Sequence, residues 1–334
     1  MAKVDVEPDL QAQELEAAPD VPREIIGRSP GQLFWRRFRK DRFAIAGLVG
    51  LGIILLLALG APAIAGIVGH AVNETFIFEM TSDLGVPLGP DLNNEAGAFY
   101  FGAADRVGHD LLVWIMYGIR TSLIVALSAT LVQVVLGVVL GLLAGFYRGR
   151  IDTVISRATD VFYALPTLLL ILGLVSACTL TAEGRGCFGG LIKPGTTLVA
   201  GVIGLFGWPY IARIIRGQVL SIREKEFVEA ARSLGASNRR IMFREILPNV
   251  VAPIIVYSTL IIPTNVLIEA ALSFLGIGVP PDVPSLGALL EKASVFYRFN
   301  PWAMVFPGLF LLSITLCFNL VGDGLRDAFD PKTA

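Results

Sequence analysis

The sequence contains few of the residues from which enzymes build active sites. Its 334 residues include two histidines and three cysteines, and neither H-E-x-x-H nor C-x-x-C occurs. These absences argue against the common zinc-protease and cysteine-rich metal sites. A G-x-x-x-x-G-K-[ST] phosphate loop is also absent, so the chain is not expected to bind ATP in the usual way. We therefore expect no catalytic residue, no metal ion and no cofactor in this chain.

Charge is also scarce. Only 16% of the residues are charged and 54% are hydrophobic, whereas soluble domains carry about 25% charged residues. The mean hydropathy is +0.68. Six uncharged runs are long enough to cross about 30 Å of hydrocarbon, namely 43–69 and about 121–147, 161–182, 194–212, 246–268 and 299–322. The sequence therefore predicts an all-α polytopic membrane protein with six transmembrane helices.

The placement of basic residues predicts how the chain is oriented. Lysine and arginine are concentrated in three segments, which are 36–42, 148–157 and 213–245. The intervening loops are poor in them, and these loops are 70–118, 183–193 and 277–298. Cytoplasmic loops of membrane proteins are enriched in lysine and arginine. Both termini and the segment 213–245 are therefore expected in the cytoplasm.

These assignments divide the chain into five parts. They are a cytoplasmic tail with a basic end (1–42), a first transmembrane helix (43–69), an extracytoplasmic loop (70–118), a core of five transmembrane helices (119–322) and a cytoplasmic C-terminal tail (323–334). A polar cytoplasmic segment at 213–248 lies inside the core, between the fourth and fifth apolar runs.

The polar segment predicts two short helices joined at a glycine. Ser221, followed three residues later by a glutamate, has the spacing of a capping box, so the first helix is expected to begin at Ile222. That helix has one narrow apolar face, made by Phe227, Ala230, Ala231 and Leu234. Gly235 suits the left-handed position that ends a helix. Ser237 is expected to cap a second helix over about 238–246.

Small residues and prolines mark the predicted transmembrane helices. Gly137, Gly141 and Gly145 repeat every four residues, which gives one helix face that another helix can approach closely. Prolines interrupt four of the spans and favour kinks in them, at Pro166, Pro209, Pro263 and Pro307.

Two features near the outer ends of the spans have open interpretations. An ionised side chain at the bilayer centre costs roughly 3 kcal/mol, so Glu269 inside the membrane would have to face a cavity or a partner. The favoured alternative is that the fifth span ends before Glu269, which then lies at the outer interface. Cys178 and Cys187 fall between the third and fourth spans, where an oxidising compartment would allow a disulfide between them.

Residues 229–248 resemble a signature of transport proteins. Glu229-Ala230-Ala231, three further residues, Gly235 and finally Leu247-Pro248 are similar to the pattern E-A-A-x3-G-x9-I-x-L-P of permease subunits of ABC importers. Glu245 departs from it, because the family has isoleucine there. Further stretches resemble the dipeptide, oligopeptide and nickel permease group, in its C-type subunit, and these are 36–49, 101–112, 117–123, 273–281, 284–287 and 322–331.

The resemblance implies a type I ABC importer permease fold in a bacterial or archaeal plasma membrane. Such a chain forms half of a pore for di- or oligopeptides and pairs with a second, similar permease. Two ATPase subunits that bind ATP and magnesium, and an extracytoplasmic substrate-binding protein, complete the implied assembly, with membrane lipid around it and no nucleic acid. The residues implied to contact an ATPase are Phe227, Glu229, Ala230, Ala231, Leu234 and Gly235. Asn265 and Glu269 are candidates for the substrate pathway.

Three alternatives accompany this interpretation. Nickel chelates or glutathione could be the cargo of the same architecture. A secondary transporter would need coupling-ion residues inside the spans and often an internal repeat, and neither is evident in the sequence. The segment 213–245 could also be an amphipathic loop on the inner leaflet, with its eight basic residues attracted to anionic lipid.

Overall fold

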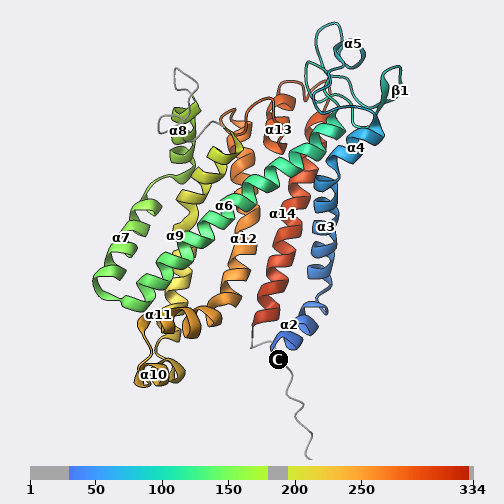
Figure 1. Cartoon of the computed structure of the whole chain (residues 1–334). Helices are drawn as coiled ribbons and strands as arrows, with labels where there is room; N and C mark the ends of the chain where they lie inside the picture. Colours follow the sequence, from blue (N-terminus) through green and yellow to red (C-terminus); the bar gives the residue numbers. More distant parts are fainter. Residues whose placement is uncertain (1–29, 180–194, 331–334) are drawn as a thin grey trace, which may run out of the picture.

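The computed structural model describes residues 30–179 and 195–330, and this part of the chain is mostly helical (Figure 1). The first half contains α2 (Pro30–Phe38), α3 (Arg42–Leu59), α4 (Ala61–Val68), α5 (Ile77–Met80), α6 (Leu111–Tyr147), α7 (Gly149–Ala164) and α8 (Thr167–Thr179). The second half contains α9 (Thr196–Ile222), α10 (Glu226–Ser233), α11 (Asn238–Arg240), a π-helix (Ile241–Ile246), α12 (Leu247–Phe274), α13 (Leu286–Ser294) and α14 (Trp302–Phe329). An antiparallel hairpin of β1 (Asp91–Asn94) and β2 (Gly97–Phe99) precedes α6.

The long helices account for the predicted spans. Within the described residues, five helices are long and apolar enough to cross a membrane, and the bent pair α7 and α8 supplies a sixth. The predicted number of six is therefore confirmed. Four of the long helices extend beyond the predicted runs: α6 already begins at Leu111, α9 continues to Ile222, α12 continues to Phe274 and α14 continues to Phe329. The side chain of Asp110 caps α6 by accepting a hydrogen bond from the Val113 amide at 3.0 Å.

The four prolines do not act alike. The chain bends by 83° between α7 and α8, at Pro166. Leu165, directly before this proline, has the extended backbone (φ −87°, ψ 137°) that proline imposes on its predecessor. By contrast, α9, α12 and α14 are continuous through Pro209, Pro263 and Pro307. The predicted kink is therefore confirmed at Pro166, and it stays a prediction at the three prolines that lie inside continuous helices.

Glycines allow α6 to pack closely along α9. A Cβ built on Gly137 would lie 2.5 Å from Ile211 Cβ, and one on Gly145 would lie 2.7 Å from Val219 Cβ. At Gly141 the nearest atom is the carbonyl oxygen of Ala212, at 2.6 Å. Real Cβ atoms essentially never approach neighbours this closely. The predicted glycine face on α6 is therefore confirmed, and α9 occupies it.

The elements gather at two ends of the bundle (Figure 1). The helices α2, α10 and α11 and the C-terminal end of α14 lie at one end, and α4, α5, β1 and α13 lie at the other. The first group belongs to the segments predicted to be cytoplasmic. In the second group, α5, β1 and α13 belong to segments predicted to be extracytoplasmic, and α4 is the outer end of the predicted first span 43–69. The arrangement agrees with the orientation inferred from the basic residues.

Candidate functional site

The polar segment between the fourth and fifth spans begins differently from the prediction. The fourth-span helix α9 continues to Ile222, and α10 begins only at Glu226, so the predicted helix start at Ile222 is wrong. Val219 and Ile222 are buried in a core cluster, which favours continuation of α9 over a new cap at Ser221. The second partner of the expected capping box, Glu224, instead accepts a hydrogen bond from Arg148 at 2.6 Å.

Helix α10 presents its apolar side chains in two directions. Val228 is fully buried in the core cluster that also contains Ile241 and Ile246. Phe227 and Leu234 are 39% and 88% exposed. Ala231 of the predicted apolar face is partly buried and packs against the same cluster as Val228. Phe227, Ala230 and Leu234 of that face are exposed. Helix α10 itself lies at the end of the molecule (Figure 1).

A glycine ends α10 as predicted. Gly235 has φ +79°, in the left-handed region, and its amide donates to the Arg232 carbonyl at 3.0 Å. The next amide, of Ala236, donates to the Ala231 carbonyl at 3.0 Å. These two hydrogen bonds define a Schellman motif, which ends the helix and turns the chain. The geometry of this turn sets the direction of α10 relative to α11.

The second predicted helix is present but has an unusual backbone. The Ser237 hydroxyl caps α11 by accepting from the Arg240 amide at 3.4 Å. A π-helix follows directly and leads into α12. Within it Ile246 is fully buried, whereas Glu245 is only partly buried. The permease pattern has isoleucine at the position of Glu245, and in this structure the buried isoleucine is the next residue, Ile246.

Ion pairs connect α9 to α7, and a hydrogen bond connects the end of α9 to the end of α6. Arg216 Nη2 lies 2.8 Å from Asp152 Oδ2, and its Nε donates to the other carboxylate oxygen. Arg213 pairs with Asp160 at 3.1 Å. Arg223, just beyond α9, donates to the backbone carbonyl of Phe146. These contacts hold the cytoplasmic end of α9 against α6 and α7.

A polar cluster joins three helices in the middle of the bundle. Asn265 of α12 is 1% exposed, and its Nδ2 donates to Thr130 Oγ1 at 2.8 Å. Gln133 of α6 donates to Asn265 Oδ1 at 3.0 Å and to the Ile203 carbonyl of α9 at 3.2 Å. Both amides border a cavity of about 370 Å³, which is also lined by Tyr163, Gly207, Tyr210, Leu260, Ile261, Thr264 and Ile268. Sequence reasoning missed Gln133, although a polar residue inside a span was a usable signal.

Glu269 lies inside the protein. Helix α12 continues to Phe274, so the span does not end before Glu269, and the favoured sequence interpretation on this point is wrong. The side chain is fully buried, and its Oε1 accepts from Ser273 Oγ at 2.7 Å. Its Oε2 has no hydrogen-bond partner among the described residues, although the hydroxyls of Ser122 and Ser285 lie nearby. Glu269 is not among the residues that line the cavity beside Asn265.

Only one of the two cysteines of the predicted disulfide lies in the part of the chain that the structure describes. Cys178 lies at the end of α8 and is 1% exposed. Cys187 and the predicted outer loop 183–193 lie outside the described residues. The pairing of the two cysteines therefore stays a prediction.

An ionic cluster at the opposite end of the bundle joins the long outer loop to α13. Asp105 accepts from Lys292 Nζ at 2.8 Å and from His109 Nδ1 at 2.9 Å. Lys292 also lies 4.0 Å from the centre of the Trp114 ring, a cation–π contact. Burial raises the pKa of Asp105, but hydrogen bonds and charge from His109 and Lys292 outweigh this effect and lower the pKa to about 2.

This cluster predicts a pH dependence that Asp105→Asn should remove. Because the folded pKa is about 2 and the ordinary value is 3.8, the ionised carboxylate contributes about 2 kcal/mol above pH 4. That contribution is lost as the pH falls from about 4 to 2. Thermal unfolding of the detergent-solubilised protein should show a lower Tm for Asp105→Asn at pH 6 and convergence with wild type near pH 2. An Asp83→Asn control, at an exposed outer-loop carboxylate, should follow wild type throughout.

Comparison with protein families shows to which family the chain belongs. The profile described as "Binding-protein-dependent transport system inner membrane component" matches residues 137–334. The chain belongs to this family. A second profile, "N-terminal TM domain of oligopeptide transport permease C", matches residues 29–77. The protein is therefore a multi-pass inner-membrane permease component, and α10 to α12 lie within the matched core.

Individual relatives are similar along most of the chain. The "Dipeptide transport system permease protein DppC" of Haemophilus influenzae is 34% identical, over 94% of this chain and 98% of its own length. The "Oligopeptide transport system permease protein OppC" of Escherichia coli K12 is 38% identical, over 92% of this chain and 93% of its own length. The "Glutathione transport system permease protein GsiD" of Pectobacterium atrosepticum is 34% identical over 93% of this chain.

A solved structure confirms the fold. The MetNI methionine ABC transporter in an inward-facing form contains a chain that superposes with a TM-score of 0.51 at 18% identity. The superposition covers 64% of this permease and 96% of that chain. The bundle described above therefore has the fold of ABC importer permeases. At this identity the comparison concerns the fold alone.

Proposed function

We propose that this permease is the non-catalytic membrane half of an ATP-driven importer for di- or oligopeptides. A second, similar permease would complete the pore, two ATPase subunits would bind ATP and magnesium, and an extracytoplasmic protein would deliver the cargo. The names of the dipeptide and oligopeptide permeases that resemble this chain along nearly their full length support the peptide cargo. Glutathione, named for another relative, is the second candidate cargo.

The exposed apolar face of α10 carries the proposal that this chain docks on an ATPase. Leu234 is 88% exposed and Phe227 is 39% exposed, at the end of the bundle where the basic residues predict cytoplasm. Ala230 and Ala231 lie between them in the sequence, and their small side chains permit close approach of a partner. Glu229 adds a charge beside this surface. In our proposal, closure of the ATPases around ATP moves α10 and, through Arg213, Arg216 and Arg223, the helices beside it.

The docking proposal is tested by Leu234→Glu. This side chain makes little contact within the protein, so the substitution should leave insertion and thermal stability unchanged. A buried interface anchor typically contributes 2 kcal/mol or more, so binding of the ATPase subunits should weaken roughly thirtyfold. Affinity purification through a tag on this chain, followed by quantification of the retained ATPase, measures the effect.

The matched control is Leu84→Glu. Leu84 is 90% exposed, but it lies in the loop at the opposite end of the bundle. This variant should retain the ATPase as wild type does. Equal retention by Leu234→Glu and the control would show that α10 does not form the docking surface.

In our proposal, the residues that line the cavity beside Asn265 form part of the wall of the peptide pathway. Peptide groups need hydrogen-bond donors and acceptors, and Gln133, Asn265 and Thr264 provide them around about 370 Å³ of space. Glu269 stays a less direct candidate, because it does not line this cavity. Competition assays with the reconstituted importer and its binding protein test the cargo. A labelled peptide should be displaced by other peptides, while displacement only by glutathione or a nickel chelate would assign the cargo to that class.

A further inference from the structure

The short helix α2 is held against the cytoplasmic end of the bundle, directly before the first span. The Phe34 ring lies 4.4 Å from the ring of Phe329 in α14, and Phe38 is buried. Arg37 Nη1 donates to the backbone carbonyl of Asp330 at 2.7 Å. Only three residues separate α2 from α3. The helix therefore has a defined place where the first span meets the predicted cytoplasmic surface of the membrane.

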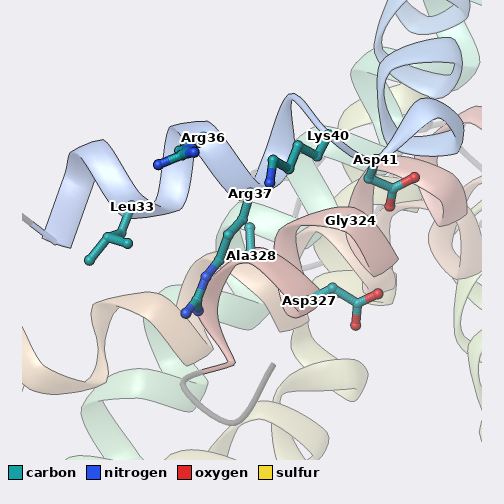
Figure 2. Close-up of a pocket in the computed structure, with 8 residues that line it drawn as sticks. All are labelled: Leu33, Arg36, Arg37, Lys40, Asp41, Gly324, Asp327 and Ala328. Carbon is teal, nitrogen blue, oxygen red and sulfur yellow. The ribbon is translucent and has the colours of Figure 1, made fainter. Parts of the chain in front are cut away.

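A cavity of about 660 Å³ lies between α2 and the end of α14. Figure 2 shows its lining, which consists of Leu33, Arg36, Arg37, Lys40, Asp41, Gly324, Asp327 and Ala328. Three of these side chains are cationic, and all three come from α2 or the turn that follows it. Arginine and lysine at this spacing can surround one phosphate with N–H donors.

The two carboxylates of the cavity do not cancel its basic character. Asp41 caps α3, because its Oδ1 accepts hydrogen bonds from the amides of Phe43 and Ala44. Its negative charge therefore interacts with the positive end of the α3 dipole. Asp327 belongs to α14, and in Figure 2 both carboxylates lie toward one end of the view while Arg36 lies toward the other. The end of the cavity near Arg36 is therefore predominantly positive.

Apolar side chains adjoin this positive surface. Trp35 is 51% exposed and Leu33 is 40% exposed on α2, and Phe43 is 74% exposed at the start of α3. A helix with basic residues beside exposed tryptophan and leucine is typical of a segment at the boundary of headgroups and acyl chains. A soluble anion would use the charges of the cavity but would leave these apolar side chains uncovered.

We propose that the cavity between α2 and α14 binds the headgroup of an anionic phospholipid from the cytoplasmic leaflet. The phosphate lies among the cations Arg36, Arg37 and Lys40, and the acyl chains extend along the exposed apolar residues at the start of α3. The lipid would fasten α2 to α14 and to the first span. This role does not depend on which cargo the permease carries or on how α10 docks.

The test is a lipid titration of the full chain purified in detergent. Bound phosphatidylglycerol is counted by native mass spectrometry for wild type and for Arg36→Gln/Lys40→Gln. Arg37 is left intact, because its hydrogen bond to Asp330 holds α2 in place. In the proposed site Arg36 and Lys40 each donate a charge-assisted hydrogen bond to the phosphate, so the double variant should bind at least about thirtyfold more weakly.

A charge-matched variant separates a site from general attraction. Arg39 and Arg42 lie in the same stretch but do not line the cavity, so Arg39→Gln/Arg42→Gln removes the same charge without removing a ligand of the phosphate. Salt screens the remaining long-range attraction, so at physiological ionic strength the affinity should change by less than about threefold. Phosphatidylcholine with the same acyl chains should bind weakly to wild type. Equal losses in both double variants, equal binding of the two lipids by wild type, or displacement of the lipid by millimolar inorganic phosphate would each overturn the proposal. Equal Tm values would show that the variants are folded.

Discussion

Replacing Gly141 with isoleucine is expected to prevent the subunit from folding stably in the membrane. A Cβ at this position would lie 2.6 Å from the carbonyl oxygen of Ala212 and 2.9 Å from Ile215 Cβ. The first of these atoms belongs to the backbone of α9 and cannot move aside as a flexible side chain can. The larger side chain would force α6 and α9 apart along their contact, at a cost of about 3 kcal/mol or more.

The effect is measured by membrane accumulation and by the Tm of the purified subunit. We expect Gly141→Ile to reduce accumulation at least tenfold, because about 3 kcal/mol is a large part of the stability of a typical domain. The control is Gly217→Ile in α9, where a Cβ would meet nothing within 4 Å. Normal accumulation of both variants would mean that the close contact of α6 with α9 is not needed for folding.

Replacing Gly235 with valine should separate ATP hydrolysis from uptake. Gly235 has φ +79°, and a non-glycine residue in the left-handed region costs roughly 1–2 kcal/mol, with more for a β-branched side chain. No neighbouring atom lies within 4 Å of a Cβ there, so the strain comes from the backbone alone. Its relief requires the Schellman turn to change, which alters the direction of α10. We expect uptake per transporter to fall at least tenfold while the subunit remains in the membrane and ATP hydrolysis continues.

Two further variants sharpen this experiment. Asparagine tolerates the left-handed conformation, so Gly235→Asn should retain uptake within about twofold of wild type. Ala231 is partly buried against the core cluster that holds Val228, so Ala231→Trp should displace α10 without changing Gly235, and it should lose uptake as Gly235→Val does. Coupled transport at the wild-type rate by both Gly235→Val and Ala231→Trp would refute the role of α10 in coupling.

The sequence was most informative where the deciding property is local. An uncharged run of about 20 residues is a spanning helix whatever its neighbours are, because only a closed hydrogen-bonded helix is stable in hydrocarbon. Glycine at every fourth position of α6 likewise predicted a close helix contact, although not that α9 would form it. Gly235 and Ser237 ended and began their helices as predicted, since these residues act through their own backbone and hydroxyl.

The errors arose where tertiary packing outweighed a local signal. The capping-box spacing at Ser221 is favourable in isolation, but burial of Val219 and Ile222 continues α9 past it. Span length alone favoured an interfacial Glu269, yet the structure buries it beside Ser273, near Ser122 and Ser285. Ser122 and Ser285 belong to parts of the chain more than a hundred residues apart, so no local pattern could have brought them to Glu269.

The sequence by itself determined the number of spans, their orientation and the place of the polar segment 213–248, because hydrophobicity and the distribution of basic residues act along the chain. Only the tertiary structure decided which side chains of α10 are buried against the bundle and which are exposed. It also brought Arg36 and Lys40 to a cavity completed by α14, nearly 300 residues later. Burial and enclosure depend on elements from distant parts of the chain, and these properties determine where a partner or a lipid can bind.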